Sequence, residues 1–185
     1  MTSLEFYHTD REKKTIRSAA KWLVDIAVIL SLGFLIAVML CESQTVSGQS
    51  MYPTMTAGDK VLVNKLQYHL SDPQRLDVII FRTQDNKLSV KRIVGLPGET
   101  VEIVDGSLYI NGELLNDKRL PQEILLTGIA SEPIYLEEEE YFVLGQNLSS
   151  SEDSRFSNVG NIKREQIEGK VWLRYAPLAN IGFIN

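Results

Sequence analysis

The pattern of apolar and polar positions divides the chain into two parts of different kinds. Residues 22–41 form one continuous apolar run, in which Asp25 is the single charged residue. As an α-helix, a run of this length spans about 30 Å, which is the thickness of the hydrocarbon core of a bilayer. The run therefore predicts a transmembrane anchor at residues 22–41.

Beyond this run, short apolar stretches alternate with turn residues, a pattern typical of β-structure. Asp105-Gly106 and Asn111-Gly112 are two-residue turn signals, and the first of them predicts a hairpin. No sustained helical periodicity competes after residue 41. The predicted strands lie at residues 61–63, 78–81, 101–104, 107–110, 141–144 and 170–175. We therefore expect a mainly β domain over residues 42–185.

Basic residues around the apolar run predict its orientation. Five cations precede Trp22, and the next cation after the run is Lys60. The positive-inside rule places residues 1–21 in the cytoplasm and residues 42–185 outside. A cleaved signal peptide or a buried core helix is the alternative, but Val38-Met39-Leu40-Cys41 lacks the small residues that cleavage requires.

Composition limits the classes of function that the chain can have. A net charge of −5 gives no basic footprint for nucleic acid. Cys41 is the only cysteine, so neither an intrachain disulfide nor a cysteine zinc site is predicted. The histidines are His8, which precedes the anchor, and His69; this scarcity disfavours a Ser-His-Asp hydrolase. The acidic run 137–140 is interpreted as a solvated turn rather than a metal site.

Two segments supply a candidate nucleophile and a candidate base. Ser50 lies in a serine-containing turn at residues 46–54, and its hydroxyl needs a base to become nucleophilic. In a strand at residues 89–94, Lys91 and Arg92 point to opposite faces, so one of them shares a face with apolar residues. A buried lysine has a lowered pKa and can act as a base, whereas a guanidinium cannot. Periodicity leaves open which cation faces inward, and an edge strand with two solvated cations is the alternative.

A third segment, residues 145–156, contains several serines followed by Asp153 and Arg155. Such a composition predicts a loop held by hydrogen bonds and an ion pair. Taken alone, it would be a surface loop.

Together the three segments resemble the conserved motifs of bacterial type I signal peptidases, in the short single-anchor form of Gram-positive bacteria. The Ser-Met-x-Pro-Thr motif is matched by residues 50–54, and the Lys-Arg-x-x-Gly-x-Pro-Gly-Asp/Glu motif by residues 91–99. The Gly-Asp-Asn…Ser-x-Asp-Ser-Arg motif is matched in part by residues 145–155. The resemblance implies a twisted antiparallel, barrel-like β peptidase domain behind one transmembrane helix, with an apolar surface resting on the plasma membrane.

The resemblance also implies a serine endopeptidase that forms an acyl-enzyme without a metal or cofactor. Ser50 would be the nucleophile and Lys91 the general base. The backbone N–H of Ser50 and a second donor near Gly48 would hold the oxyanion. The remaining implied site residues are Ser151, which would orient the lysine, Asp153 and Arg155, which would brace the loop, and Met51, assigned either to a substrate pocket or to the core.

The implied substrates are secretory preproteins with small side chains one and three residues before the cut, bound by strand addition. Three positions depart from the motifs: Gln146 replaces an aspartate, Leu148 an arginine, and Ala176 a tryptophan. A catalytically silent relative that assists pilus or surface-structure assembly is therefore the alternative. A self-cleaving repressor with Ser-Lys chemistry is disfavoured, because the chain has an anchor and no DNA-binding segment.

Overall fold

A computed structural model describes residues 3–39 and 41–184, and the side chains of 17–35 and 41–184. The chain forms two compact units, Met1–Leu40 and Cys41–Asn185. In the first unit, helix α1 (Ser3–Met39) contains a stretch, Arg17–Leu35, with a mean hydropathy of 1.7 and no buried residue. Its length and composition suit a membrane span. The predicted anchor extended to Cys41, but the described helix ends at Met39 and Cys41 is the first residue of a strand. Leu40 lies outside the described residues.

The second unit is mainly β, as predicted. Its strands are β1 (Cys41–Thr45), β2 (Lys60–Asn64), β3 (Val78–Arg82), β4 (Leu88–Gly95), β5 (Thr100–Val104), β6 (Ser107–Ile110), β7 (Glu113–Leu114), β8 (Ile134–Tyr135), β9 (Glu140–Leu144), β10 (Ile162–Lys163), β11 (Ile167–Ala176) and β12 (Gly182–Phe183). The helical pieces are α2 (Gln67–Leu70) and the 3₁₀ turns η1 (Gly128–Ser131), η2 (Leu148–Ser150), η3 (Arg164–Gln166) and η4 (Leu178–Asn180).

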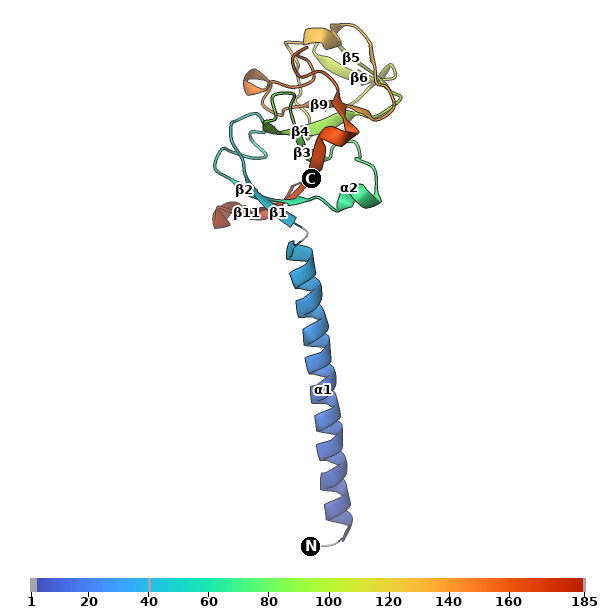
Figure 1. Cartoon of the computed structure of the whole chain (residues 1–185), viewed down its shortest axis with the longest axis vertical. Helices are drawn as coiled ribbons and strands as arrows, with labels where there is room; N and C mark the ends of the chain where they lie inside the picture. The colour runs from blue at the N-terminus through green and yellow to red at the C-terminus, as the bar shows by residue number, and fades with distance from the viewer. Residues whose placement is uncertain (1–2, 40, 185) are drawn as a thin grey trace. The chain divides into compact units, whose positions relative to one another are not determined.

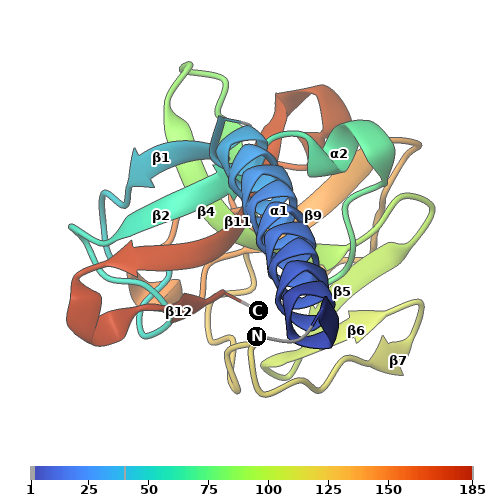
Figure 2. The same cartoon turned by 90° about the horizontal axis from the view of Figure 1, so that it is seen from below.

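These strands build two antiparallel sheets. The larger has the order β1-β2-β11-β3-β4-β9-β10, with β12 added on β11, and the smaller has the order β7-β6-β5-β8. Within this domain, β5 and β6 lie at the end away from β1, β2 and β11 (Figures 1 and 2). In the smaller sheet, a two-residue turn explains why β5 and β6 are adjacent. Asp105 and Gly106 both have positive φ, as a type I′ hairpin turn requires, and Val104 pairs with Ser107 across it.

The segment that carries Ser50 is anchored in the apolar core. Met51 and Met55 are 1% and 0% exposed and belong to one cluster with Val61, Val63 and Val171. Those valines come from β2 and β11, which are adjacent in the larger sheet. Burial of two long side chains on either side of a turn restricts how far the turn can move.

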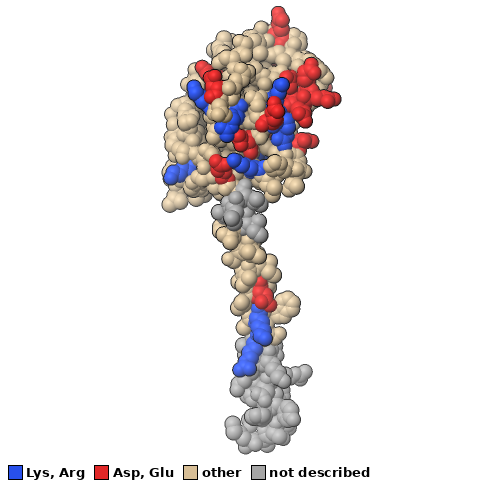
Figure 3. Space-filling model, in the orientation of Figure 1, with Lys and Arg blue, Asp and Glu red and all other residues tan. Residues whose placement is uncertain are grey.

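The surface of the β domain carries charges of both signs, with acidic side chains gathered along one edge of the face shown in Figure 3. Glu137, Glu138 and Glu139 are exposed in a turn before β9. The solvated turn predicted for residues 137–140 is confirmed for the first three, whereas Glu140 is half-buried and begins β9.

Candidate active site

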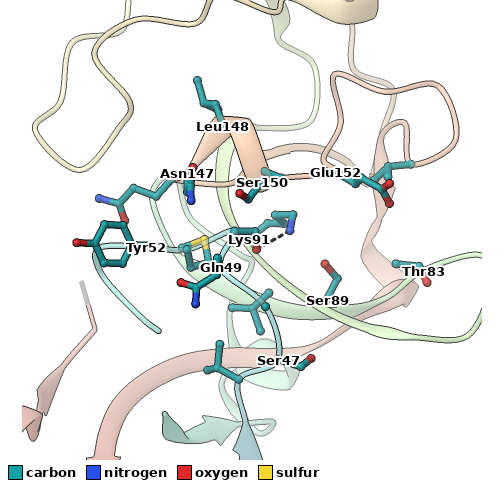
Figure 4. Close-up of a pocket in the computed structure, with 18 of the residues that line it drawn as sticks. Ser47, Gln49, Tyr52, Thr83, Ser89, Lys91, Asn147, Leu148, Ser150 and Glu152 are labelled. Atoms are coloured by element: carbon teal, nitrogen blue, oxygen red, sulfur yellow. Dashed lines mark hydrogen bonds between the residues drawn. The ribbon is translucent and has the colours of Figure 1, made fainter. Parts of the chain in front are cut away.

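An open groove of about 1580 Å³ brings together the three segments that the sequence singled out. The turn at residues 47–52, the start of β4 and the loop at residues 146–152 all line it. In Figure 4, the Lys91 side chain ends at a hydrogen bond inside the pocket, with Asn147, Leu148 and Ser150 on one side and Ser47 and Gln49 on the other.

Ser50 lies on a tight turn that follows Gly48. Gly48 has φ +98°, a backbone conformation that residues with a side chain rarely adopt. The Tyr52 N–H donates to the Gln49 carbonyl at 3.1 Å, and the Met55 N–H donates to the Met51 carbonyl at 2.9 Å. The turn leaves Ser50 half-buried at the groove while Met51 enters the core. Met51 also lines the groove. It therefore belongs to both the core and the groove, the two places that the sequence left as alternatives.

Lys91 is the partner of the Ser50 hydroxyl. Its Nζ donates to Ser50 Oγ at 2.9 Å, although the two residues are far apart in the sequence. The side chain of Lys91 is 4% exposed. Burial lowers the pKa of Lys91 to about 8, against the opposing effect of the negative charges of Asp153 and Glu152. A substantial fraction of this amine is therefore neutral near physiological pH.

The neighbouring cation, Arg92, shows where the sequence prediction was incomplete. We expected one of the two cations to face inward, yet Arg92 is also buried, at 2% exposure, and donates to the Leu76 carbonyl at 2.7 Å. The alternative of two solvated cations on an edge strand is wrong. Strand β4 pairs with β3 over residues 88–92 and with β9 from Arg92 onward, so Arg92 lies inside the sheet, and the side chains of both cations are buried.

The third segment is held by the predicted ion pair. Asp153 is fully buried, and its carboxylate accepts hydrogen bonds from Arg155 Nε at 2.8 Å, the Gly145 N–H at 3.0 Å and Ser151 Oγ at 2.6 Å. Arg155 also donates to the Leu126 carbonyl at 2.9 Å. Ser151 was expected to contact Lys91, but among the described residues its hydroxyl is bonded to Asp153. The orienting role of Ser151 thus remains a prediction. The charge of Asp153, which accepts the Ser151 hydrogen bond, raises the pKa of Lys91.

Gly145 allows the loop to pack directly on the Ser50 turn. A Cβ at this position would lie 2.1 Å from Ser151 Oγ and 2.8 Å from the Ser50 carbonyl oxygen. Both contacts are far shorter than van der Waals distance. The absence of a side chain at residue 145 therefore lets the two segments meet.

Two residues near the site escaped the sequence analysis. Glu152 acts electrostatically on Lys91, and buried Ser154 accepts the Val143 N–H at 3.0 Å. Both lie inside the third motif, and the assignment of Ser151 to orient Lys91 is the one signal that its neighbour Glu152 lies near residue 91.

A buried lysine hydrogen-bonded to a serine hydroxyl in an open groove is the arrangement of a Ser-Lys hydrolase. Comparison with known proteins specifies the class. The model of the signal peptidase family, peptidase S26, matches residues 19–176. The chain belongs to this family and is a serine peptidase of the bacterial type I signal peptidase class, which confirms the resemblance seen in its motifs.

Individual relatives agree. Signal peptidase I P of Bacillus subtilis subsp. natto is 33% identical over 181 residues, covering 93% of this chain and 97% of the relative. Signal peptidase I T of Bacillus subtilis strain 168 is 34% identical over 166 residues, covering 85% of each chain. A crystal structure of a signal peptidase I from Enterococcus faecalis V583 is 37% identical, with a TM-score of 0.45, and covers 54% of this chain and 97% of that one.

The lowered pKa of Lys91 predicts the pH dependence. The protonated amine cannot accept a proton, so kcat/KM should rise as the pH increases through about 8 and then level off. The charge of Glu152 raises the pKa of Lys91, so Glu152→Gln should move the rise to lower pH, by up to about half a pH unit. The measurement is kcat/KM against pH for both proteins. Glu113→Gln, on β7 of the smaller sheet, should leave the profile unchanged; an unmoved profile in Glu152→Gln would contradict this account.

Proposed function

We propose that this protein is a membrane-anchored endopeptidase that removes N-terminal signal peptides from secretory preproteins with Ser50 as nucleophile and Lys91 as general base. The observation that carries the proposal is the 2.9 Å hydrogen bond between Lys91 Nζ and Ser50 Oγ, made by an amine that is almost entirely buried. Burial keeps part of the amine neutral, which a base needs, and the 2.9 Å separation lets the neutral amine accept the Ser50 proton.

The reaction then proceeds in two halves. Neutral Lys91 accepts the Ser50 proton as Oγ attacks the scissile carbonyl, and the resulting ammonium donates this proton to the leaving amine as the C–N bond breaks. The product is an ester between Ser50 and the signal peptide. Lys91 next accepts a proton from water, whose oxygen attacks the ester carbonyl, and Ser50 recovers its hydrogen as the ester C–O bond breaks.

The oxyanion of each tetrahedral intermediate would be held by backbone donors. Among the described residues, none accepts a hydrogen bond from the Ser50 N–H, so this donor is available to the groove. Gly48 lines the same groove, and its conformation turns the chain just before the nucleophile. We assign the first oxyanion donor to Ser50 and the second to the backbone near Gly48. Neither donor involves a cofactor or metal.

The substrate would bind as an added strand along the start of β4. Strand β9 pairs with β4 from Arg92 onward, whereas Leu88–Lys91 pair with β3 alone and lie at the groove. Their second edge is therefore open to an extended peptide. With Met51 filling part of the groove floor, side chains near the cut must be small.

Cleavage of a preprotein tests this proposal. The full-length protein in detergent should cut a preprotein that has alanine one and three residues before the junction. Changing either alanine to phenylalanine should lower kcat/KM by at least about 100-fold, because a bulky side chain has no pocket to enter. Mass spectrometry of the released peptide identifies the bond. Equal cleavage of all three substrates would rule out the assigned pocket.

We also propose that the anchor crosses the plasma membrane once, with the N-terminus in the cytoplasm and the β domain outside. The apolar, exposed stretch Arg17–Leu35 of α1 and the basic residues that precede Trp22 support this orientation. In a Cys41→Ser background, a cysteine at exposed Leu125 should react with a membrane-impermeant maleimide in intact cells. A cysteine at Ser3 should react only after lysis. The reverse result, in which the cysteine at residue 3 reacts in intact cells and the one at residue 125 only after lysis, would show that the orientation is the opposite of the proposed one.

A further inference from the structure

The turn that carries Ser50 is fastened to the third motif by three consecutive residues. The Asn147 N–H donates to the Ser50 carbonyl at 2.9 Å, and Gly145 leaves room for that carbonyl. Between them, the side-chain carbonyl of Gln146 accepts a hydrogen bond from the Thr54 hydroxyl. The loop thus contacts the turn at its beginning and again at its end.

Thr54 is also held from its other side. Arg174, on β11, donates from the same Nη1 to the Thr54 carbonyl at 2.9 Å and to Asp59 Oδ2 at 3.1 Å. Asp59 is 2% exposed, so this ion pair belongs to the folded body of the domain. The carbonyl of Thr54 is therefore attached to the larger sheet, and its hydroxyl links the turn to the loop.

This link matters because the two reacting side chains come from separate elements. Ser50 is on the turn and Lys91 on β4, while Asp153, which acts on Lys91, is on the loop. The loop follows β9, whose Leu144 pairs with Arg92 next to Lys91, so the separation of Ser50 Oγ and Lys91 Nζ depends on how the turn docks against the loop. Small displacements of reacting groups cost large factors in rate.

We propose that Thr54 and Gln146 are a pair of positioning residues whose hydrogen bond holds the Ser50 turn at reacting distance from Lys91. The inference rests on the function proposed above and extends it to two residues that do not take part in the Ser50–Lys91 hydrogen bond. Gln146 is the position where the chain departs from the aspartate of its motif. An amide supplies the same acceptor to Thr54 without adding a negative charge to the groove that contains Lys91.

A double-mutant cycle on the full-length enzyme in detergent tests the pair. Thr54→Val and Gln146→Ala should each lower kcat on a preprotein by roughly 5- to 10-fold with KM within about twofold, because each removes the same neutral hydrogen bond. The double variant should be no slower than the slower single variant. Losses that multiply in the double variant, or a wild-type kcat for Thr54→Val, would overturn the proposal.

Two further variants separate positioning from general damage. Thr54→Ser keeps the hydroxyl and should restore most of kcat. Gln146→Glu keeps the acceptor but adds a charge, so its kcat at high pH should stay within about twofold of wild type while its pH profile moves upward, as a raised pKa of Lys91 requires. If Gln146→Glu instead loses activity equally at every pH, the pair is not a positioning device.

Thr100→Val provides the matched control. Thr100 lies on β5 in the smaller sheet, and its bonds with Asn111 use backbone atoms that the substitution retains. Its kcat should equal that of the wild type. The test is also distinct from the test of function: an inactive wild type would refute the peptidase assignment, whereas multiplying losses in an active enzyme would refute only the pair.

Discussion

Replacing Ser50 with alanine, or Lys91 with either methionine or arginine, should lower kcat on a preprotein by on the order of 10⁴-fold or more. Ser50→Ala removes the atom that would form the ester. Lys91→Met removes the base while keeping a side chain of similar length in a site that is 4% exposed. Lys91→Arg keeps the charge but cannot lose a proton, so it should be as inactive as the methionine variant.

These variants must remain folded for the result to bear on chemistry. Ser50 is half-buried at an open groove and loses only one hydrogen bond, so Ser50→Ala should unfold at nearly the wild-type temperature. Ser131→Ala removes an exposed hydroxyl bonded to the Gly128 carbonyl and is the control, with wild-type kcat expected. Retained cleavage by a folded Ser50→Ala or Lys91→Met protein would refute the assignment of the pair. An inactive wild type would instead favour the silent-relative alternative.

The second large effect is expected on stability. Asp153→Ala should lower the free energy of unfolding by about 3–5 kcal/mol, because it leaves the guanidinium of Arg155 buried without its counter-charge. Arg155 is 1% exposed, and the Gly145 N–H and Ser151 hydroxyl would lose their acceptor as well. Urea unfolding of the full-length protein in detergent micelles, followed by tryptophan fluorescence, measures the change.

The chain offers a control with the same spacing. Asp117 and Arg119 are also two residues apart and form an ion pair at 2.8 Å, but their side chains are 26% and 44% exposed. Asp117→Ala should therefore cost less than about 1 kcal/mol. If the two substitutions cost the same, burial of the Asp153–Arg155 pair is not what makes it stabilising.

The secondary structure was largely predictable because its signals are local. Asp105-Gly106 favours positive φ at two successive residues, and that conformation closes a hairpin wherever the turn occurs. The helix over the apolar run follows in the same way from a local composition that only Asp25 interrupts. The short strands β1, β7, β8, β10 and β12 escaped prediction, since they have little apolar pattern of their own and depend on the strands beside them.

The site was predictable only through its motifs. Alternation along β4 placed Lys91 and Arg92 on opposite faces but could not show that both are buried, because burial depends on the segments that pack on each face of the sheet, which alternation does not identify. Composition alone would not have selected Ser50 from a turn with other polar residues. The family resemblance made that selection, and the hydrogen bond to Lys91 is consistent with it.

By itself, the sequence determined the anchor-like helix and the β character of the second unit. These two properties depend on composition and near-neighbour pattern, whereas the choice of Ser50 and Lys91 came from the motifs of the family. Tertiary structure alone decided that Lys91 loses its solvent, that its amine meets the Ser50 hydroxyl, and that Thr54 meets Gln146. Each of these depends on atoms brought together from separate segments, and burial and hydrogen-bond geometry are properties of that assembly rather than of any one stretch of chain.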